Sequence, residues 1–298
     1  MHWNNYARQY YELNPPKGNY PGDIWCELPS GGLLGEERTS GIVITPACDL
    51  SNRKVDTITY LPIIPVLSYF STTAFLPEVR RRVDGQLSTA GLAGLVKWSE
   101  SLLPPEASAL ASAQRKLEEC LESKSLGAKQ LEAGRRALVG VRIIMEIAAP
   151  TLSRCNPEDL HNLFREKEWE QMRTQIVTNS YRNDIHFLPG DGQDKAWSGV
   201  PEHSLVLFRY PMTMPTELFE SAQDVGLSDW NSAVEVAART MPVARAFSGV
   251  RPTKRIRLLP RFFADLMTRY VSIYIRIGSP DFSQGTVQRY AEDIGRTA

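Results

Sequence analysis

The chain has 298 residues, of which 42% are hydrophobic, so it is long enough and apolar enough to bury a sizeable core. It carries 34 basic and 34 acidic residues, and its formal net charge is zero. This balance excludes a global electrostatic attraction to nucleic acids or to membrane surfaces, so any such attraction must be local.

The sequence shows no sign of export or of membrane insertion. Its first twenty residues lack a basic segment followed by an apolar run, and no stretch of about 18 apolar residues occurs. The cysteines Cys26, Cys48, Cys120 and Cys155 lie far apart and form no CxxC pair. We therefore expect reduced thiols, a cytoplasmic location, no membrane partner and no cofactor.

Residues 22–66 have the pattern of an all-β unit. The segments GDIWCEL, TSGIVITPA and VDTITYLPII are rich in β-formers and are separated by turn-rich stretches. Three strands with short connections are predicted.

From about residue 77 to residue 180 the apolar period becomes helical. A helical hairpin is predicted, with its link at residues 124–128, and a further helix should begin at Asn156 with Pro157 in its first position. The apolar positions that define these faces are Leu110, Ala113, Leu117 and Cys120, then Leu131, Leu138 and Met145, and then Leu160, Phe164, Met172 and Ile176.

Strand patterns return after residue 184, in the segments DIHFLPG and HSLVLFRYPMTM. Helices are expected near Pro215 and Ser228, followed by TKRIRLLP as a strand or an extended segment. A closing helix should begin at Pro260 and end near Ile277, before the stop at residues 278–280.

The first β unit resembles the PemK/MazF family of toxin endoribonucleases. The resemblance is carried by residues 22–24 (GDI), Arg38 and residues 41–45 (GIVIT), and then by residues 187–189 (FLP) and 204–208 (SLVLF). It implies an α+β protein with a small SH3-like β-barrel, formed by residues 1–66 and 181–298. A helical insertion at residues 67–180 would interrupt the barrel, and C-terminal helices would follow it.

The family resemblance also implies catalytic residues. Arg38 matches the family's arginine, but the threonine expected at the end of the third strand is Ile64 here. Isoleucine can neither donate a hydrogen bond nor transfer a proton at phosphate.

A second resemblance is to uncharacterised bacterial proteins that have an Ile-Thr-x-x-Cys-Asp strand end, here residues 44–49, and a late helix rich in aromatic residues and arginine. It implies a setting near phage-defence or signalling genes and a protein partner encoded in the same operon.

Cys48, Asp49 and His186 are the candidates for thiol or metal chemistry. A thiolate at Cys48 needs a base such as His186, and a metal site needs all three side chains to converge. The alternative is that Cys48 fills the barrel end as a small apolar group while Asp49 caps the turn after it.

Arg38 is the candidate for binding phosphate. The alternative is that it lies on a solvated flank or pairs with Glu36 or Glu37.

The segment from residue 245 to residue 276 contains eight basic residues and one acidic residue, Asp265. Together with interleaved aromatic residues, this stripe could contact RNA phosphates and stack on bases. The favoured alternative is an internal strut whose arginines face the acidic segment 184–235. The candidates for nucleic-acid binding are Lys254, Arg255, Arg257, Arg261 and Arg269.

Three functions remain open from the sequence. The first is a non-catalytic partner-binding or regulatory protein of a bacterial defence or toxin-linked module. The second is a divergent endoribonuclease that uses Arg38 and the tip formed by Cys48 and Asp49. The third is a thiol- or metal-dependent hydrolase based on Cys48, Asp49 and His186.

Overall fold

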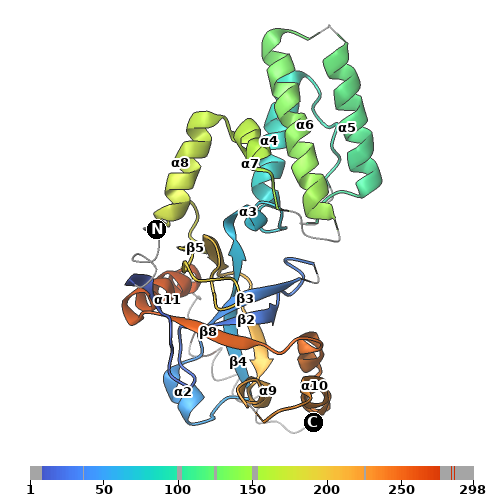
Figure 1. Cartoon of the computed structure of the whole chain (residues 1–298). Coiled ribbons are helices and arrows are strands. Elements are labelled where there is room, and N and C mark those ends of the chain that lie inside the picture. The colour runs from blue at the N-terminus through green and yellow to red at the C-terminus, as the bar shows by residue number, and fades with distance from the viewer. Residues whose placement is uncertain are drawn as a thin grey trace.

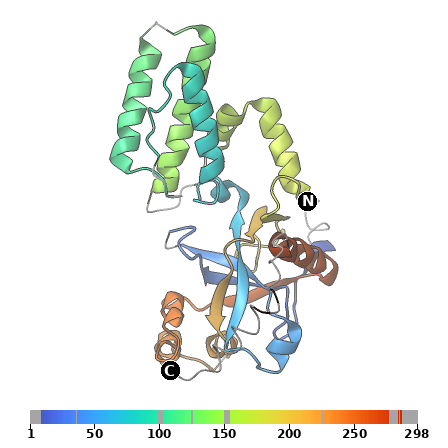
Figure 2. The ribbon, with the colours of Figure 1, turned by 180° about the vertical axis from the view of Figure 1, so that it is seen from behind.

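The computed structural model describes residues 9–35, 37–98, 103–123, 126–149, 154–224 and 226–275, together with residues 283 and 285. The protein is α+β, as predicted. One antiparallel sheet forms the lower part of the molecule in Figure 1, and a group of helices rises from it. Figure 2 shows the same arrangement from behind.

The sheet has eight strands in the order β1-β8-β2-β3-β4-β6-β5, and β7 pairs separately with β4. The strand bounds are β1 (Tyr11–Glu12), β2 (Asp23–Pro29), β3 (Arg38–Val43), β4 (Thr57–Pro65), β5 (Ile185–Leu188), β6 (Ser204–Leu207), β7 (Met212–Pro215) and β8 (Thr253–Leu258). The segment TKRIRLLP therefore contributes a strand, which lies between the two N-terminal strands β1 and β2.

The predicted strands on both sides of the helical segment belong to one sheet, but the sheet is open. Within the described residues no strand pair joins the end strands β1 and β5, so the closure expected of a small barrel is not seen. Of the side chains predicted to lie inside, Ile58 and Leu207 are buried and Ile44 is half-buried.

Helices cover both faces of the sheet. Adjacent residues of a strand point to opposite faces, and accordingly Ile24 and Trp25 enter different cores. The core of Ile24 includes Leu266 of α11 (Pro260–Ile275). The core of Trp25 is closed by α9 (Thr216–Ser221), α10 (Trp230–Ala238) and the 3₁₀ helix η1 (Pro242–Phe247).

The helical segment runs from α3 (Val66–Tyr69) to α8 (Glu166–Val177) and includes the predicted hairpin. The hairpin consists of α5 (Ala107–Glu122) and α6 (Ala128–Ala148), which pack against each other. Helix α6 also packs on α4 (Leu76–Ala90). Close packing of α6 on α4 requires Gly140, because an added Cβ there would collide with Val83. Leu110 and Leu117 are buried as predicted, but Leu138 is only half-buried, and Val141 is among the buried residues of α6.

Three boundaries differ from the sequence prediction. The helix after Asn156 is two helices, α7 (Pro157–Phe164) and α8, which meet at Arg165. The long strand predicted after His203 is divided into β6 and β7. The end of β3 leads into a short helix, α2 (Ala47–Ser51), instead of a simple turn.

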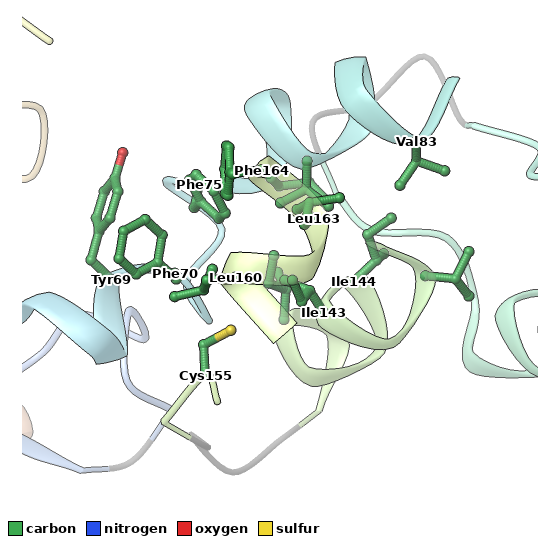
Figure 3. Close-up of a cluster of buried hydrophobic side chains, with 14 of the residues drawn as sticks. Tyr69, Phe70, Phe75, Val83, Ile143, Ile144, Cys155, Leu160, Leu163 and Phe164 are labelled. Atoms are coloured by element: carbon green, nitrogen blue, oxygen red, sulfur yellow. The ribbon is translucent and has the colours of Figure 1, made fainter. Parts of the chain in front are cut away.

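A continuous apolar core joins the helical segment to the sheet, and Figure 3 shows the part of this core that lies in the helical segment. Phe70 packs edge-on against Phe75 and against Trp169, with ring centroids 4.8 Å and 5.5 Å away. The same cluster contains Ile64 of β4 and Leu205 of β6. We therefore expect the helical segment, predicted at residues 67–180, to unfold together with the sheet formed by the residues on either side of it.

No helix within the described part of the chain is both long enough and apolar enough to cross a lipid bilayer.

Replacing Phe70 with alanine tests this shared core. Because Phe70 is fully buried, Phe70→Ala should lower the free energy of unfolding by about 3–5 kcal/mol. Urea unfolding followed by circular dichroism and by tryptophan fluorescence should show coincident transitions. The exposed control Val177→Ala should change stability by no more than about 0.5 kcal/mol. A helical signal that melts separately from the rest would contradict the shared core.

Candidate functional site

A pocket of about 400 Å³ lies where the helical segment meets the sheet; we call it the junction pocket. One wall is formed by β2 and β3, and the opposite wall by the loop of residues 195–204. Arg255 of β8 contributes to the lining, as do Ser68 of α3 and Arg154, which precedes α7. Ligand sites are commonly found at such junctions between structural units.

A β-bulge in β2 shapes the first wall. The register with β3 shifts between Trp25 and Leu28, and Glu27 has a φ of 64°, which is uncommon for a residue with a side chain. Because of the bulge, Trp25 and Leu28 enter the same core although they are three positions apart. Cys26 and Glu27, between them, line the pocket. Bulges often re-aim side chains next to functional sites.

The buried carboxylate of Asp191 fixes the loop that forms the second wall. It is 0% exposed and accepts hydrogen bonds from Ser198 Oγ at 2.8 Å and from the backbone N–H groups of Gln193, Gly199 and Val200 at 3.0, 2.7 and 2.9 Å. A buried carboxylate with four donors needs no further partner. The loop conformation therefore depends on this one side chain.

The loop then binds the first wall through two carbonyl groups. Cys26 Sγ donates to Ser198 O at 3.4 Å, and Ser40 Oγ donates to Gly199 O at 2.7 Å. Gly199 must be small here, because an added Cβ would lie 2.7 Å from a side-chain carbon of Ile256. Burial raises the pKa of the Cys26 thiol, so Cys26 acts as a neutral donor and not as a thiolate.

Some of the charges at the pocket are matched within the chain. Arg154 forms a salt bridge with Glu202 at 2.5 Å. Arg38 donates to the carbonyls of Ala246 at 2.7 Å and Ser248 at 2.5 Å. The Arg154 guanidinium thus links two sides of the pocket lining, and the Arg38 guanidinium links the pocket to η1 and the residue after it.

Four other charged side chains at the pocket have no ion-pair partner in the part of the chain that the structure describes. No ion pair within the described residues involves Glu27, Glu37, Lys195 or Arg255. The pocket therefore offers two carboxylates and two cations to a ligand.

The predicted thiol or metal site is not assembled in the described residues. Cys48 is exposed on α2, and its thiol lies 3.5 Å from Asp49 Oδ1. His186 is buried on β5, where its ring stacks on Phe208. No group of three histidine, cysteine, aspartate or glutamate side chains in the described part is placed to hold a metal ion.

The alternative roles suggested for Cys48 and Asp49 also need correction. Cys48 does not fill the end of a barrel, because it is exposed. Within the described residues, the Asp49 carboxylate accepts a hydrogen bond from the neighbouring thiol of Cys48. The turn after α2 is closed by Asn52, whose side-chain N–H donates to Cys48 O at 2.7 Å.

His186 is poorly suited to act as the base that a Cys48 thiolate would need. Burial lowers its pKa to about 4, with the nearby Asp265 opposing this shift and Arg269 adding to it. Because strand residues alternate between faces, His186 lies on the face that α11 covers, and its Nδ1 has no hydrogen-bond partner among the described residues.

Arg38 binds backbone carbonyls instead of the acidic neighbours that the sequence suggested. Its partners belong to η1 and the residue after it. Glu36 lies outside the described residues, and no ion pair joins Arg38 to Glu37 among those that are described.

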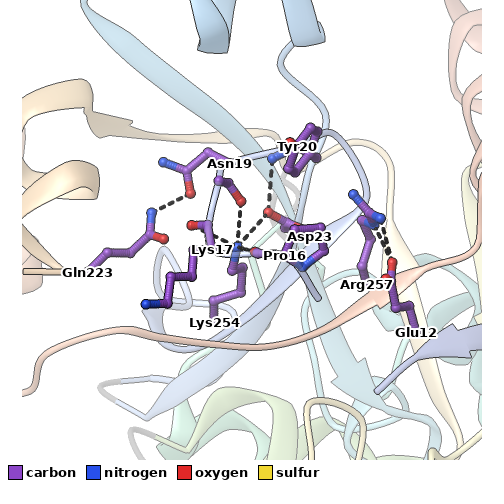
Figure 4. A network of polar contacts seen from close by, with 10 residues as sticks. Glu12, Pro16, Lys17, Asn19, Tyr20, Asp23, Gln223, Lys254 and Arg257 are labelled. Atoms are coloured by element: carbon purple, nitrogen blue, oxygen red, sulfur yellow. Dashed lines mark hydrogen bonds and ion pairs between the residues drawn. The ribbon is translucent and has the colours of Figure 1, made fainter. Parts of the chain in front are cut away.

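Most of the predicted nucleic-acid stripe is occupied by contacts within the chain, and many of these reach the N-terminal segment (Figure 4). Lys254 Nζ donates to the carbonyls of Pro16 and Gly18, each at 2.6 Å, and Arg257 pairs with Glu12. Burial lowers the pKa of Lys254, and the neighbouring Asp23 opposes that shift.

The two arginines on α11 have backbone partners as well. Arg261 donates to Gln9 O at 3.0 Å, and Arg269 donates to Asn179 O. Both of these carbonyl partners lie outside segment 184–235, but Arg269 lies near His186 of that segment, because its charge helps to lower the pKa of that imidazole. Within the described residues neither arginine forms an ion pair with a carboxylate of segment 184–235. Arg255, in contrast, lines the junction pocket, and Arg276 lies outside the described residues.

Comparison with protein-family models, with curated proteins and with solved structures finds no significant match.

Sequence reasoning missed Cys26, Glu27, Asp191 and Lys195. The only local signal was the segment GDGQD, in which Asp191 lies between two glycines; such a sequence indicates a loop but not a buried carboxylate.

Replacing Asp191 with alanine should release the loop. Because Asp191→Ala leaves four donors without an acceptor, we expect a loss of about 2–4 kcal/mol in the free energy of unfolding. Asp194→Ala, in the same loop, is the control, since Asp194 is exposed and should be nearly neutral. Equal denaturation midpoints for the two variants would contradict this role of Asp191.

The accessibility of Cys26 provides a second test. Iodoacetamide at pH 8 should alkylate exposed Cys48 well before Cys26, because Cys26 is partly buried and its raised pKa keeps the thiol protonated at that pH. Alkylation of Cys26 should accelerate in Asp191→Ala, as measured by peptide mass spectrometry. Equal rates at Cys26 and Cys48 in the unmodified protein would show that the loop does not cover Cys26.

Proposed function

We propose that this protein is a non-catalytic binding protein, and that the junction pocket takes a charged segment of a protein partner. The observation that carries the proposal is the lining of the pocket by unmatched charges of both signs, Glu27 and Glu37 together with Lys195 and Arg255. A polypeptide segment with acidic and basic side chains complements such a lining.

The state of the reactive side chains supports binding over catalysis. A nucleophilic cysteine needs a depressed pKa or an adjacent base, whereas the pKa of Cys26 is raised and the contacts of its thiol are with Ser40 and with loop carbonyls. His186 stacks on Phe208 on the α11 side of the sheet. Neither the thiol nor the imidazole is equipped to drive hydrolysis.

The dimensions of the pocket fit the proposed ligand. A volume of about 400 Å³ falls within the range of pockets that accept small molecules or a few side chains. Ser40 also lines it. Because the Ser40 hydroxyl already donates to the carbonyl of Gly199, it would meet a ligand as an acceptor.

The biological setting is part of the proposal and rests on the sequence resemblances. On that basis the partner is encoded in the same operon of a bacterial defence or toxin-linked module, and both proteins are cytoplasmic. The open sheet is proposed to derive from the PemK/MazF-like barrel. The endoribonuclease alternative is less well supported, because Arg38 is held by carbonyl groups and Ile64 is fully buried in the core.

Site-specific photo-crosslinking in the native host tests this proposal. A photoreactive residue at position 195 should capture a protein partner, whereas the same residue at position 116 is the matched control. Both positions are exposed lysines, but Lys116 lies on α5, away from the pocket.

The captured partner should then be purified and its affinity measured. Lys195→Glu and Arg255→Glu should each weaken binding about tenfold or more, because each places a like charge against the partner's acidic group. Lys116→Glu should leave the affinity unchanged. Equal capture at both positions, capture of RNA instead of protein, or unchanged affinity in the charge reversals would refute the proposal.

A further inference from the structure

A second pocket, of about 430 Å³, lies on the helical segment between α6 and the α7–α8 junction; we call it the arginine groove. It shares no lining residue with the junction pocket. Its charged lining residues are Glu132, Arg135, Arg136, Arg165 and Glu166.

Two of the three guanidinium groups have no ion-pair partner among the residues that the structure describes. Arg136 forms a salt bridge with Glu132 at 2.5 Å. Within the described residues neither Arg135 nor Arg165 takes part in an ion pair, and both are exposed. After the matched pair is set aside, the groove presents two guanidinium groups and a single carboxylate, Glu166.

Arg165 also has an unusual backbone conformation. Its φ of 62° and ψ of 153° fall in a region that glycine adopts readily and that other residues adopt only with strain. Glycine would therefore suit the α7–α8 junction better on backbone grounds alone. The arginine side chain is thus not explained by the turn that it occupies.

We propose that the arginine groove binds a polyphosphate-bearing small ligand. Guanidinium groups match phosphate oxygens in a bidentate geometry, and Arg135 and Arg165 flank the groove from α6 and from the α7–α8 junction. The exposed imidazole of His161 lies in the same lining and offers a further hydrogen-bonding group. This site is independent of the proposed partner segment in the junction pocket.

Isothermal titration calorimetry of the full chain with inorganic tripolyphosphate tests the proposal, with ATP as a second ligand and glutamate as an anion without phosphate. Tripolyphosphate and ATP should bind saturably with one site per chain, and their affinity should fall as sodium chloride is added. Glutamate should not bind at this site. A comparison of ATP with tripolyphosphate shows whether the nucleoside contributes.

Variants separate binding from folding. Arg135→Gln and Arg165→Gly should each weaken tripolyphosphate binding about tenfold, and Arg165→Gly should also raise the melting temperature because it relieves the backbone strain. Arg115→Gln on the outer face of α5 is the control and should bind like the unmodified chain. The absence of saturable binding, or equal affinity in Arg135→Gln, Arg165→Gly and the unmodified chain, would overturn the proposal.

Discussion

The apolar cluster in which Phe70 and Trp169 of the helical segment pack with Ile64 of β4 and Leu205 of β6 fixes the helical segment on the sheet, and the walls of the junction pocket depend on it. Ser68 lies two residues before Phe70, and Arg154 directly precedes Cys155, which is buried in the same core. A rotation of the helical segment would therefore move both residues away from β2 and β3. Apolar burial, which has no directional preference of its own, positions the directional polar groups of the pocket.

The sequence predicted the elements that depend on local periodicity. The hairpin of α5 and α6, the start of α7 at Asn156 and the start of α11 at Pro260 follow from apolar spacing and capping, and the structure confirms them. The break at Arg165 was missed because a positive φ at an arginine has no sequence signature. The position of β8 between β1 and β2 was missed because it depends on pairing between segments more than 200 residues apart.

The candidate site was less predictable than the fold, because it depends on which residues meet across the chain. The basic stripe is evident in the sequence, but the carbonyls that bind Lys254 belong to Pro16 and Gly18 at the other end of the chain. A meeting of His186 with Cys48 would require the second and fourth predicted strands to end on related sides of one closed barrel. Strand alternation instead turns His186 toward α11, and Cys48 lies on the short helix α2. Asp191 shows most clearly that a buried carboxylate is recognised only once its donors are in place.

Two polar surfaces result from this organisation, one at the junction pocket and one at the arginine groove. We propose above that a protein partner binds in the junction pocket. Amide hydrogen exchange of the full chain, measured with and without the captured partner, tests it most directly. We expect slower exchange in residues 26–40 and 191–204 when the partner is bound, with exchange in α5 unchanged. Protection confined to α5, or no protection in those two segments, would contradict it.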